Sequence, residues 1–147
     1  PLLRLVEEGL QSSDRPVKFS VQGDGGRLPA TIATPLSVVI LELLQNAVDH
    51  GFPEGSQGGS VLVTLGSNHD HALTVQVINN GRGLKPDFEM SKVTGLGLSI
   101  VRTLVTTELA GTIQMRAGNV GDSTKDLIIA RDGDGTVVEL VIPVARD

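Results

Sequence analysis

The segment Thr34–His50 constrains the fold most, because it carries the clearest helix pattern in the chain. Thr34 can cap the helix, and Pro35 follows at the first helical position, where its missing N–H costs nothing. Gly51 is expected to end the helix. Apolar residues recur at helical spacing, so one stripe is predicted to be buried. The stripe comprises Val38, Leu41, Leu44, Ala47 and Val48.

Three polar residues interrupt this apolar helix: Glu42, Asn46 and His50. Because they are spaced four apart, they stack along one face with a drift of about 40° per step. An ordinary solvated face would account for them. However, Glu42 and Asn46 lie among leucines, and burying a polar group without a partner costs about 1–3 kcal/mol. We therefore expect this face to meet a ligand.

Two glycine motifs follow along the chain. The first, 79–83 (NNGRG), comes directly after a predicted strand, where its glycines allow a sharp turn and a close approach to a ligand. The second, 95–99 (GLGLS), opens a predicted helix whose free N–H groups and dipole favour a phosphate. Taken singly, the first motif fits a plain turn and the second fits tight helix–strand packing.

The rest of the chain alternates short strands with turns, which predicts an α+β fold. We expect a single domain over residues 1–147, built as a two-layer α/β sandwich. Its mixed, mostly antiparallel sheet would be covered on one face by about three helices. Besides 34–50, helices are predicted at 1–12 and 96–109, and strands at 17–21, 61–65, 73–77, 112–116, 127–130 and 137–144. Residues 132–135 are predicted to form a hairpin turn between the last two strands.

Composition excludes several classes of protein. The chain has no Cys, so it has neither a disulfide framework nor a thiolate metal site. Its only aromatic residues are 3 Phe and its net charge is −5, which argues against nucleic-acid binding. No run of 18 apolar residues is present, so we expect no membrane span in this segment and a cytoplasmic location. The core must be aliphatic.

In combination and in this order, the three motifs are specific. Glu42, Asn46 and Ala47, followed by the two glycine motifs, resemble the N box and the two glycine boxes of the GHKL family, which includes gyrase B, the heat-shock 90 chaperone, MutL and the histidine kinases. The resemblance covers residues 34–144 and implies the Bergerat ATP-binding fold. Within the family, the segment 41–52 is similar to the N box of HisKA_2 and HWE-type sensor kinases.

The resemblance implies roles for the matching helix residues. Asn46 would coordinate Mg²⁺ through its side-chain oxygen, which suits that ion. Glu42 would lie near the γ-phosphate and polarise the attacking nucleophile as a general base. His50 would lie near the phosphates of ATP and donate a hydrogen bond to them.

It also implies roles for the glycine motifs. Asn79 occupies the position where the family usually has Asp, which accepts a hydrogen bond from the adenine amino group. Gly81 and Gly83 would shape the adenine pocket. Lys85, Lys92 and Arg82 are candidates for a phosphate contact, although a solvated surface charge is the simpler explanation of each lysine. The phosphate-binding helix start comprises Gly95, Leu96, Gly97 and Leu98.

Two features depart from the common family pattern. An amide at Asn79 can still accept a hydrogen bond from adenine, but without the charge assistance of a carboxylate, so we expect weaker ATP affinity. Only Leu84 to Thr94 separates the glycine motifs, a short lid that matches the HisKA_2-type resemblance.

The resemblance implies a histidine protein kinase acting in two-component signal transduction, with a phosphoacceptor His on a helical dimerisation segment. None of the 3 His residues has that setting, so we expect dimerisation helices upstream, a homodimeric full-length protein and no autophosphorylation by this segment alone. The partner would be a response regulator, for example one of the RNA-binding antiterminator type. The alternatives are a serine kinase of the anti-sigma-factor type and a non-catalytic nucleotide sensor, the latter suggested by Asn79.

Overall fold

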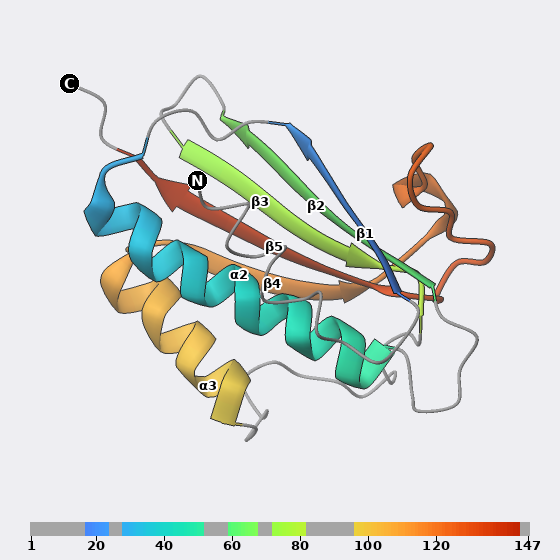
Figure 1. The fold of residues 1–147 in the computed structure, drawn as a ribbon, viewed down its shortest axis with the longest axis horizontal. Helices are drawn as coiled ribbons and strands as arrows, with labels where there is room; N and C mark the ends of the chain where they lie inside the picture. The colour runs from blue at the N-terminus through green and yellow to red at the C-terminus, as the bar shows by residue number, and fades with distance from the viewer. Residues whose placement is uncertain (1–16, 24–27, 52–58, 68–71, 82–95, 145–147) are drawn as a thin grey trace.

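The computed structural model describes residues 17–23, 28–51, 59–67, 72–81 and 96–144. They form two layers, with helices α2 (Ala30–Gly51) and α3 (Leu96–Thr103) on one face of a five-stranded sheet (Figure 1). The α+β two-layer sandwich is therefore confirmed. The helix predicted at 1–12 lies outside the described residues. The strands are β1 (Val17–Gly23), β2 (Gly59–Ser67), β3 (Ala72–Asn79), β4 (Thr112–Ala117) and β5 (Thr136–Pro143).

The sheet is mixed and mostly antiparallel, as expected. The strand order is β1-β2-β3-β5-β4, and only the β1–β2 pair is parallel. Because parallel neighbours need a long connection, α2 forms the crossover between them. In the register of the sheet, Asn79 lies between Val61 of β2 and Thr136 of β5. These three residues form a row across the end of β3.

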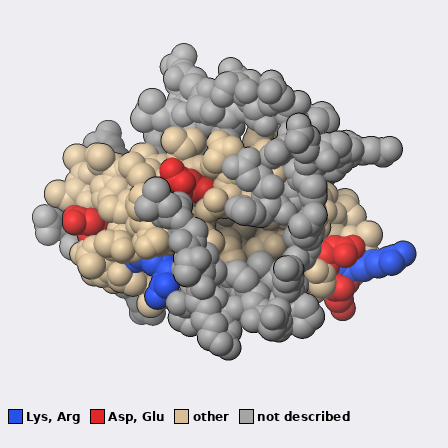
Figure 2. All heavy atoms as spheres, turned by 90° about the horizontal axis from the view of Figure 1, so that it is seen from below, with Lys and Arg blue, Asp and Glu red and all other residues tan. Residues whose placement is uncertain are grey.

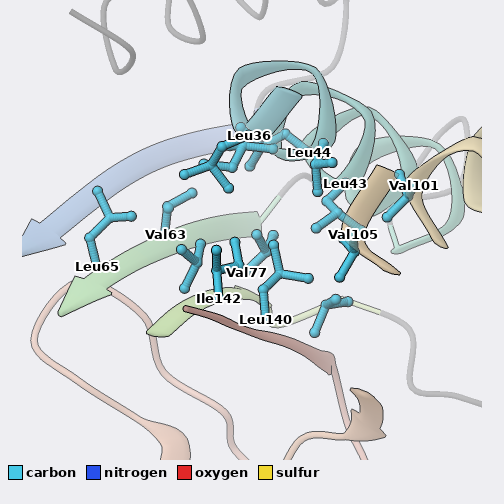
Figure 3. Close-up of a cluster of buried hydrophobic side chains, with 14 of the residues drawn as sticks. Leu36, Leu43, Leu44, Val63, Leu65, Val77, Val101, Val105, Leu140 and Ile142 are labelled. Carbon is cyan, nitrogen blue, oxygen red and sulfur yellow. The ribbon is translucent and has the colours of Figure 1, made fainter. Parts of the chain in front are cut away.

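An aliphatic core fills the space between the sheet and the helices (Figure 3). Each of the central strands contributes alternate residues to it, for example Val63, Val77 and Leu140, while α3 and the turn after it contribute Val101 and Val105. Fully burying a side chain of this size contributes about 1.5–3 kcal/mol. The expected aliphatic core is confirmed, because its buried members are Leu, Val, Ile and Ala.

Helix α2 begins four residues earlier than predicted. Its first residue is Ala30, and the carbonyl of Pro29 accepts the N–H groups of Ile32 and Ala33 at 2.9 Å. Pro35 therefore lies inside the helix, and the predicted cap at Thr34 is wrong. The added turn places Ile32 against the core, and this burial outweighs the backbone hydrogen bond that Pro35 cannot donate.

The buried stripe of α2 is also broader than predicted and rotated. Val38 and Leu41 are 44% and 38% exposed, whereas Leu36, Val39 and Ile40 are fully buried. The helix packs against both the sheet and α3, so side chains on two of its sides are buried. By length and composition α2 is the one described helix that could cross a membrane, but here it is the central helix of the core.

The second long helix covers nearly the range that was predicted, but only its first part is α-helical. After Thr103 it continues as a π-helical turn, Leu104–Glu108, closed by a 2.9 Å hydrogen bond from Leu109 N–H to the Leu104 carbonyl. The chain then reverses at Ala110, whose φ is 51°, one residue before the predicted stop at Gly111.

The predicted strand Leu127–Ala130 is wrong, and so is the hairpin that it implied. β4 pairs directly with β5, and residues 118–135, which we call the excursion, connect them. Leu127 and Ile129 are buried, but against Leu62 and Ile78 on the sheet face opposite the helices. The alternating apolar residues that suggested a strand therefore belong to a loop, which they attach to the sheet. Thr124 and Leu127 form an isolated β-bridge within this loop.

Candidate functional site

The candidate site lies at one end of the molecule. Figure 1 shows that α2 and β3 both end there, and that α3 runs antiparallel to α2, so that its N-terminus faces the same end. We call this end of the molecule the site end. Seen from below, the described surface carries its charged side chains in a few separate groups, and most of it is uncharged (Figure 2).

Asn46 presents a buried amide nitrogen at the site end that has no partner among the described residues. Its Nδ2 is buried, and within the described part of the chain no hydrogen bond reaches it. Glu42, one turn earlier on the same helix, is half-buried. His50 lies in the last turn of α2, but its side chain is outside the described residues. Since a buried amide is normally satisfied, Asn46 marks a place where a ligand is expected.

This observation fits a site for Mg²⁺ and phosphate. Oδ1 of Asn46 is not among the buried atoms without a partner in the described structure, and an amide oxygen is an acceptable ligand for Mg²⁺. The described residues contain no group of three acidic or His side chains able to hold a metal alone.

Asn79 is the second amide of the site end. It ends β3, is only 5% exposed, and shares the helix-side face with Val75 and Val77. Its Oδ1 accepts the N–H of Gly81 at 3.0 Å, which closes a tight turn directly after the strand. The predicted turn of the first glycine motif is thus present from Asn79 to Gly81, where the described segment ends.

Thr136 belongs to the same row and was not singled out from the sequence. It lies opposite Asn79, is 7% exposed, and shares a face with Val138 and Leu140. Among the described residues, Asn79 and Thr136 are the buried polar side chains. The alternation along the last strand could have revealed Thr136, because it puts a polar residue on an otherwise apolar face.

Asn80 and Gly135 stabilise the turn at 79–81 through hydrogen bonds to neighbouring segments. Asn80 Oδ1 accepts the Ser60 N–H at 2.8 Å, and its Nδ2 donates to the Ile128 carbonyl at 3.2 Å. Gly135 donates its N–H to the Gly81 carbonyl at 2.9 Å. The site end is therefore tied to β2 and to the excursion on the far side of the sheet.

The second glycine motif is described only in part. α3 begins at Leu96 and includes Gly97, as predicted for a helix opened by this motif, and Leu98 packs against the core. The remaining predicted site residues, Gly83, Lys85 and Gly95, lie outside the described residues, as do Arg82 and Lys92.

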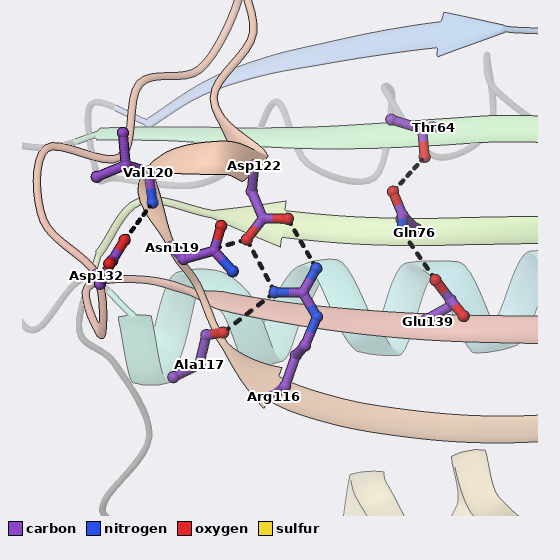
Figure 4. Close-up of polar contacts among 9 residues, drawn as sticks. All are labelled: Thr64, Gln76, Arg116, Ala117, Asn119, Val120, Asp122, Asp132 and Glu139. Atoms are coloured by element: carbon purple, nitrogen blue, oxygen red, sulfur yellow. Dashed lines mark hydrogen bonds and ion pairs between the residues drawn. The ribbon is translucent and has the colours of Figure 1, made fainter.

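Several polar side chains away from the site end are paired with other protein groups (Figure 4). Arg116 binds Asp122 through two hydrogen bonds of 2.7 and 2.8 Å, and Asp122 also accepts the Asn119 N–H. The hydrogen bond from Arg116 lowers the pKa of Asp122 below its ordinary value, and the same bond raises the pKa of Arg116. On the sheet, Gln76 links Thr64 to Glu139.

Comparisons with known proteins converge on one group. The family described as histidine kinase-, DNA gyrase B-, and HSP90-like ATPase matches residues 31–146. The sensor histidine kinase PdtaS of Mycobacterium tuberculosis (strain H37Rv) is 40% identical over 141 residues, which cover 96% of this chain and 25% of that protein. The chain thus spans about a quarter of the length of this relative.

Solved structures agree on the fold. The histidine kinase domain of the blue-light activated histidine kinase from Erythrobacter litoralis matches with a TM-score of 0.77 and 27% identity, covering 97% of this chain and 63% of that chain. The catalytic domain of histidine kinase ThkA, in a nucleotide-free form, matches with a TM-score of 0.68 at 22% identity, covering 99% of this chain and 90% of that one.

Proposed function

The chain belongs to the histidine kinase-, DNA gyrase B- and HSP90-like ATPase family, and on that premise we propose that it is the ATP-binding catalytic domain of a two-component sensor histidine kinase. One observation carries the proposal. Two amides, the unpartnered Asn46 and the buried Asn79, lie where α2 and β3 end and where α3 presents its N-terminus. The identity with PdtaS supports a sensor kinase over the anti-sigma-factor type of serine kinase.

We assign roles to the residues of α2 first. Asn46 would hold Mg²⁺ through Oδ1, Glu42 would orient and deprotonate the attacking group, and His50 would donate a hydrogen bond to the phosphates. When bound, Mg-ATP supplies the γ-phosphoryl group, which passes to a His on a separate dimerisation segment and then to an Asp of a response regulator.

Asn79 and the two glycine motifs would bind the base and the phosphates of the nucleotide. Asn79 would contact the base, and Gly81 and Gly83 would let the backbone approach it. Lys85 would reach a phosphate. The N-terminal turn of α3 would offer its free N–H groups to the phosphates. That turn and the residue before it comprise Gly95, Leu96, Gly97 and Leu98.

The wider setting is also part of the proposal. Residues 1–147 would be a single domain of a longer, homodimeric kinase whose dimerisation and phosphoacceptor helices precede it. The kinase would act in the cytoplasm on a response regulator, and we favour a regulator of the RNA-binding antiterminator type. The domain alone would bind nucleotide without phosphorylating itself.

Calorimetric titration with ATP, with and without Mg²⁺, tests the proposal. We expect binding in the micromolar to millimolar range that Mg²⁺ strengthens, and we expect Asn46→Ala to abolish the Mg²⁺-dependent part. Gln45→Ala, which removes an exposed amide one position away on the same helix, is the matched control and should bind like the parent chain. Absence of binding at millimolar ATP would contradict the proposal.

A further inference from the structure

The amide of Asn79 has a fixed orientation. A backbone N–H can only be accepted by the side-chain oxygen, so the 3.0 Å contact from Gly81 N–H assigns Oδ1 to the turn. The choice between the two amide orientations, which is usually ambiguous, is settled here by the hydrogen bond itself. What remains of the side chain is Nδ2, which carries two N–H donors.

Among the described residues, no acceptor lies within hydrogen-bond distance of Nδ2, and since Nδ2 is not one of the buried atoms without a partner, it keeps contact with solvent although the residue is 5% exposed. A ligand that displaces water from this donor has to accept its N–H, because the donor would otherwise be left unpaired at a cost in free energy. A carboxylate at this position would behave in the opposite way. With one oxygen accepting from Gly81, its other oxygen would still be an acceptor, suited to a base amine.

We propose that Asn79 selects the nucleobase by donating a hydrogen bond from Nδ2, so that the site accepts 6-oxopurine nucleoside triphosphates at least as well as ATP. The inference rests on the proposed function, because it needs the base to lie against Asn79. Adenine offers an amine at position 6, which is a donor and opposes Nδ2. Hypoxanthine and guanine offer a carbonyl oxygen there, which matches it. Inosine triphosphate is the cleaner probe, since it lacks the 2-amino group of guanine.

The experiment compares Mg-ATP and Mg-ITP binding to the chain and to Asn79→Asp by calorimetry. We expect ITP to bind the parent chain at least as tightly as ATP. In Asn79→Asp, the affinity for ITP relative to ATP should fall about tenfold or more, as expected when a donor is replaced by an acceptor at a buried position. Asn79→Ala, which removes both groups, should give an intermediate ratio.

Gln45→Glu adds the same negative charge at an exposed position of α2 and controls for electrostatics. It should change both affinities together and leave their ratio alone. If ATP is preferred to the same extent by the parent chain and by Asn79→Asp, the base-selection inference is wrong while the proposed function stands. If neither nucleotide binds the folded parent chain at millimolar concentration, both are wrong.

Discussion

The site end and the excursion differ in whether their polar groups have protein partners. In the excursion, Asp122 binds Arg116 and Asn119, and Asp132 accepts the Val120 N–H at 2.8 Å (Figure 4). At the site end, Asn46 Nδ2 is buried without a partner in the described structure. The difference teaches that the paired polar groups stabilise the loop conformation, whereas the unpartnered amide of Asn46 does not, in line with the proposal that it meets a ligand.

The largest effect is expected where the excursion meets the site end. Gly135 has a φ of 73°, and a Cβ there would collide with the Asn79 carbonyl. Gly135→Ala should lower the free energy of unfolding by about 3 kcal/mol or more, from backbone strain plus overlap. Urea unfolding measures it.

Gly133→Ala is the matched control, because Gly133 also has a positive φ, 95°, but has open space around its Cβ position. Gly133→Ala should lower the free energy of unfolding by about 1–2 kcal/mol, which is the cost of the left-handed backbone conformation without any steric overlap. Equal losses in the two variants would show that the close approach to Asn79 contributes nothing.

Asn80 is expected to give the next largest effect, because both ends of its amide are paired. Asn80→Ala leaves the Ser60 N–H and the Ile128 carbonyl without this partner, and should cost about 1–3 kcal/mol. It should also weaken nucleotide binding by loosening the turn below Asn79. A loss of stability with unchanged nucleotide affinity would separate the two regions and contradict the link between them.

The Arg116–Asp122 pair should contribute about 1 kcal/mol or less, since the Arg116 side chain is 49% exposed. A double-mutant cycle with Arg116→Ala and Asp122→Ala measures the coupling. The pKa of Asp122 is lowered in the folded state, so this contribution is present above the ordinary carboxyl pKa and is lost as the pH falls through the folded value. A coupling that persists at low pH would refute the assignment.

The smallest change in stability is expected at Asn46. Asn46→Ala removes a buried amide that has no described partner and places a better helix former in α2, so stability should stay within about 0.5 kcal/mol or rise slightly. Thermal unfolding without nucleotide is the measurement. A clear loss would mean that the amide is structural, and the contrast with the excursion would fail.

The sequence predicted the local elements well where periodicity and burial agree. β1, β2 and β3 and the two helices follow from apolar spacing. Asn46 was proposed as a site residue from its position among apolar neighbours, whereas Asn79 was proposed from the resemblance of its glycine motif to that of the GHKL family. It failed where tertiary packing overrides a local signal. Pro35 marks a helix start by its own chemistry, yet Ile32 gains more by extending the helix into the core.

The excursion shows a second limit. Alternation at 127–130 has the same period whether the buried residues face a strand neighbour or the back of a sheet, so periodicity alone cannot identify the partner. The role of Asn80 depends on Ser60 and Ile128, which are distant in the chain. Such long-range hydrogen bonds leave no pattern in a single sequence.

The strand order has a consequence for how the chain acquires its fold. β5 is the last described strand in the chain, but it lies between β3 and β4 in the sheet and brings Thr136 opposite Asn79. A chain emerging from the ribosome can form the β2–β3 hairpin early, yet β4 has no strand partner and the row of Val61, Asn79 and Thr136 is incomplete before β5 arrives. Assembly of the sheet must therefore wait for long-range contacts, which slow folding.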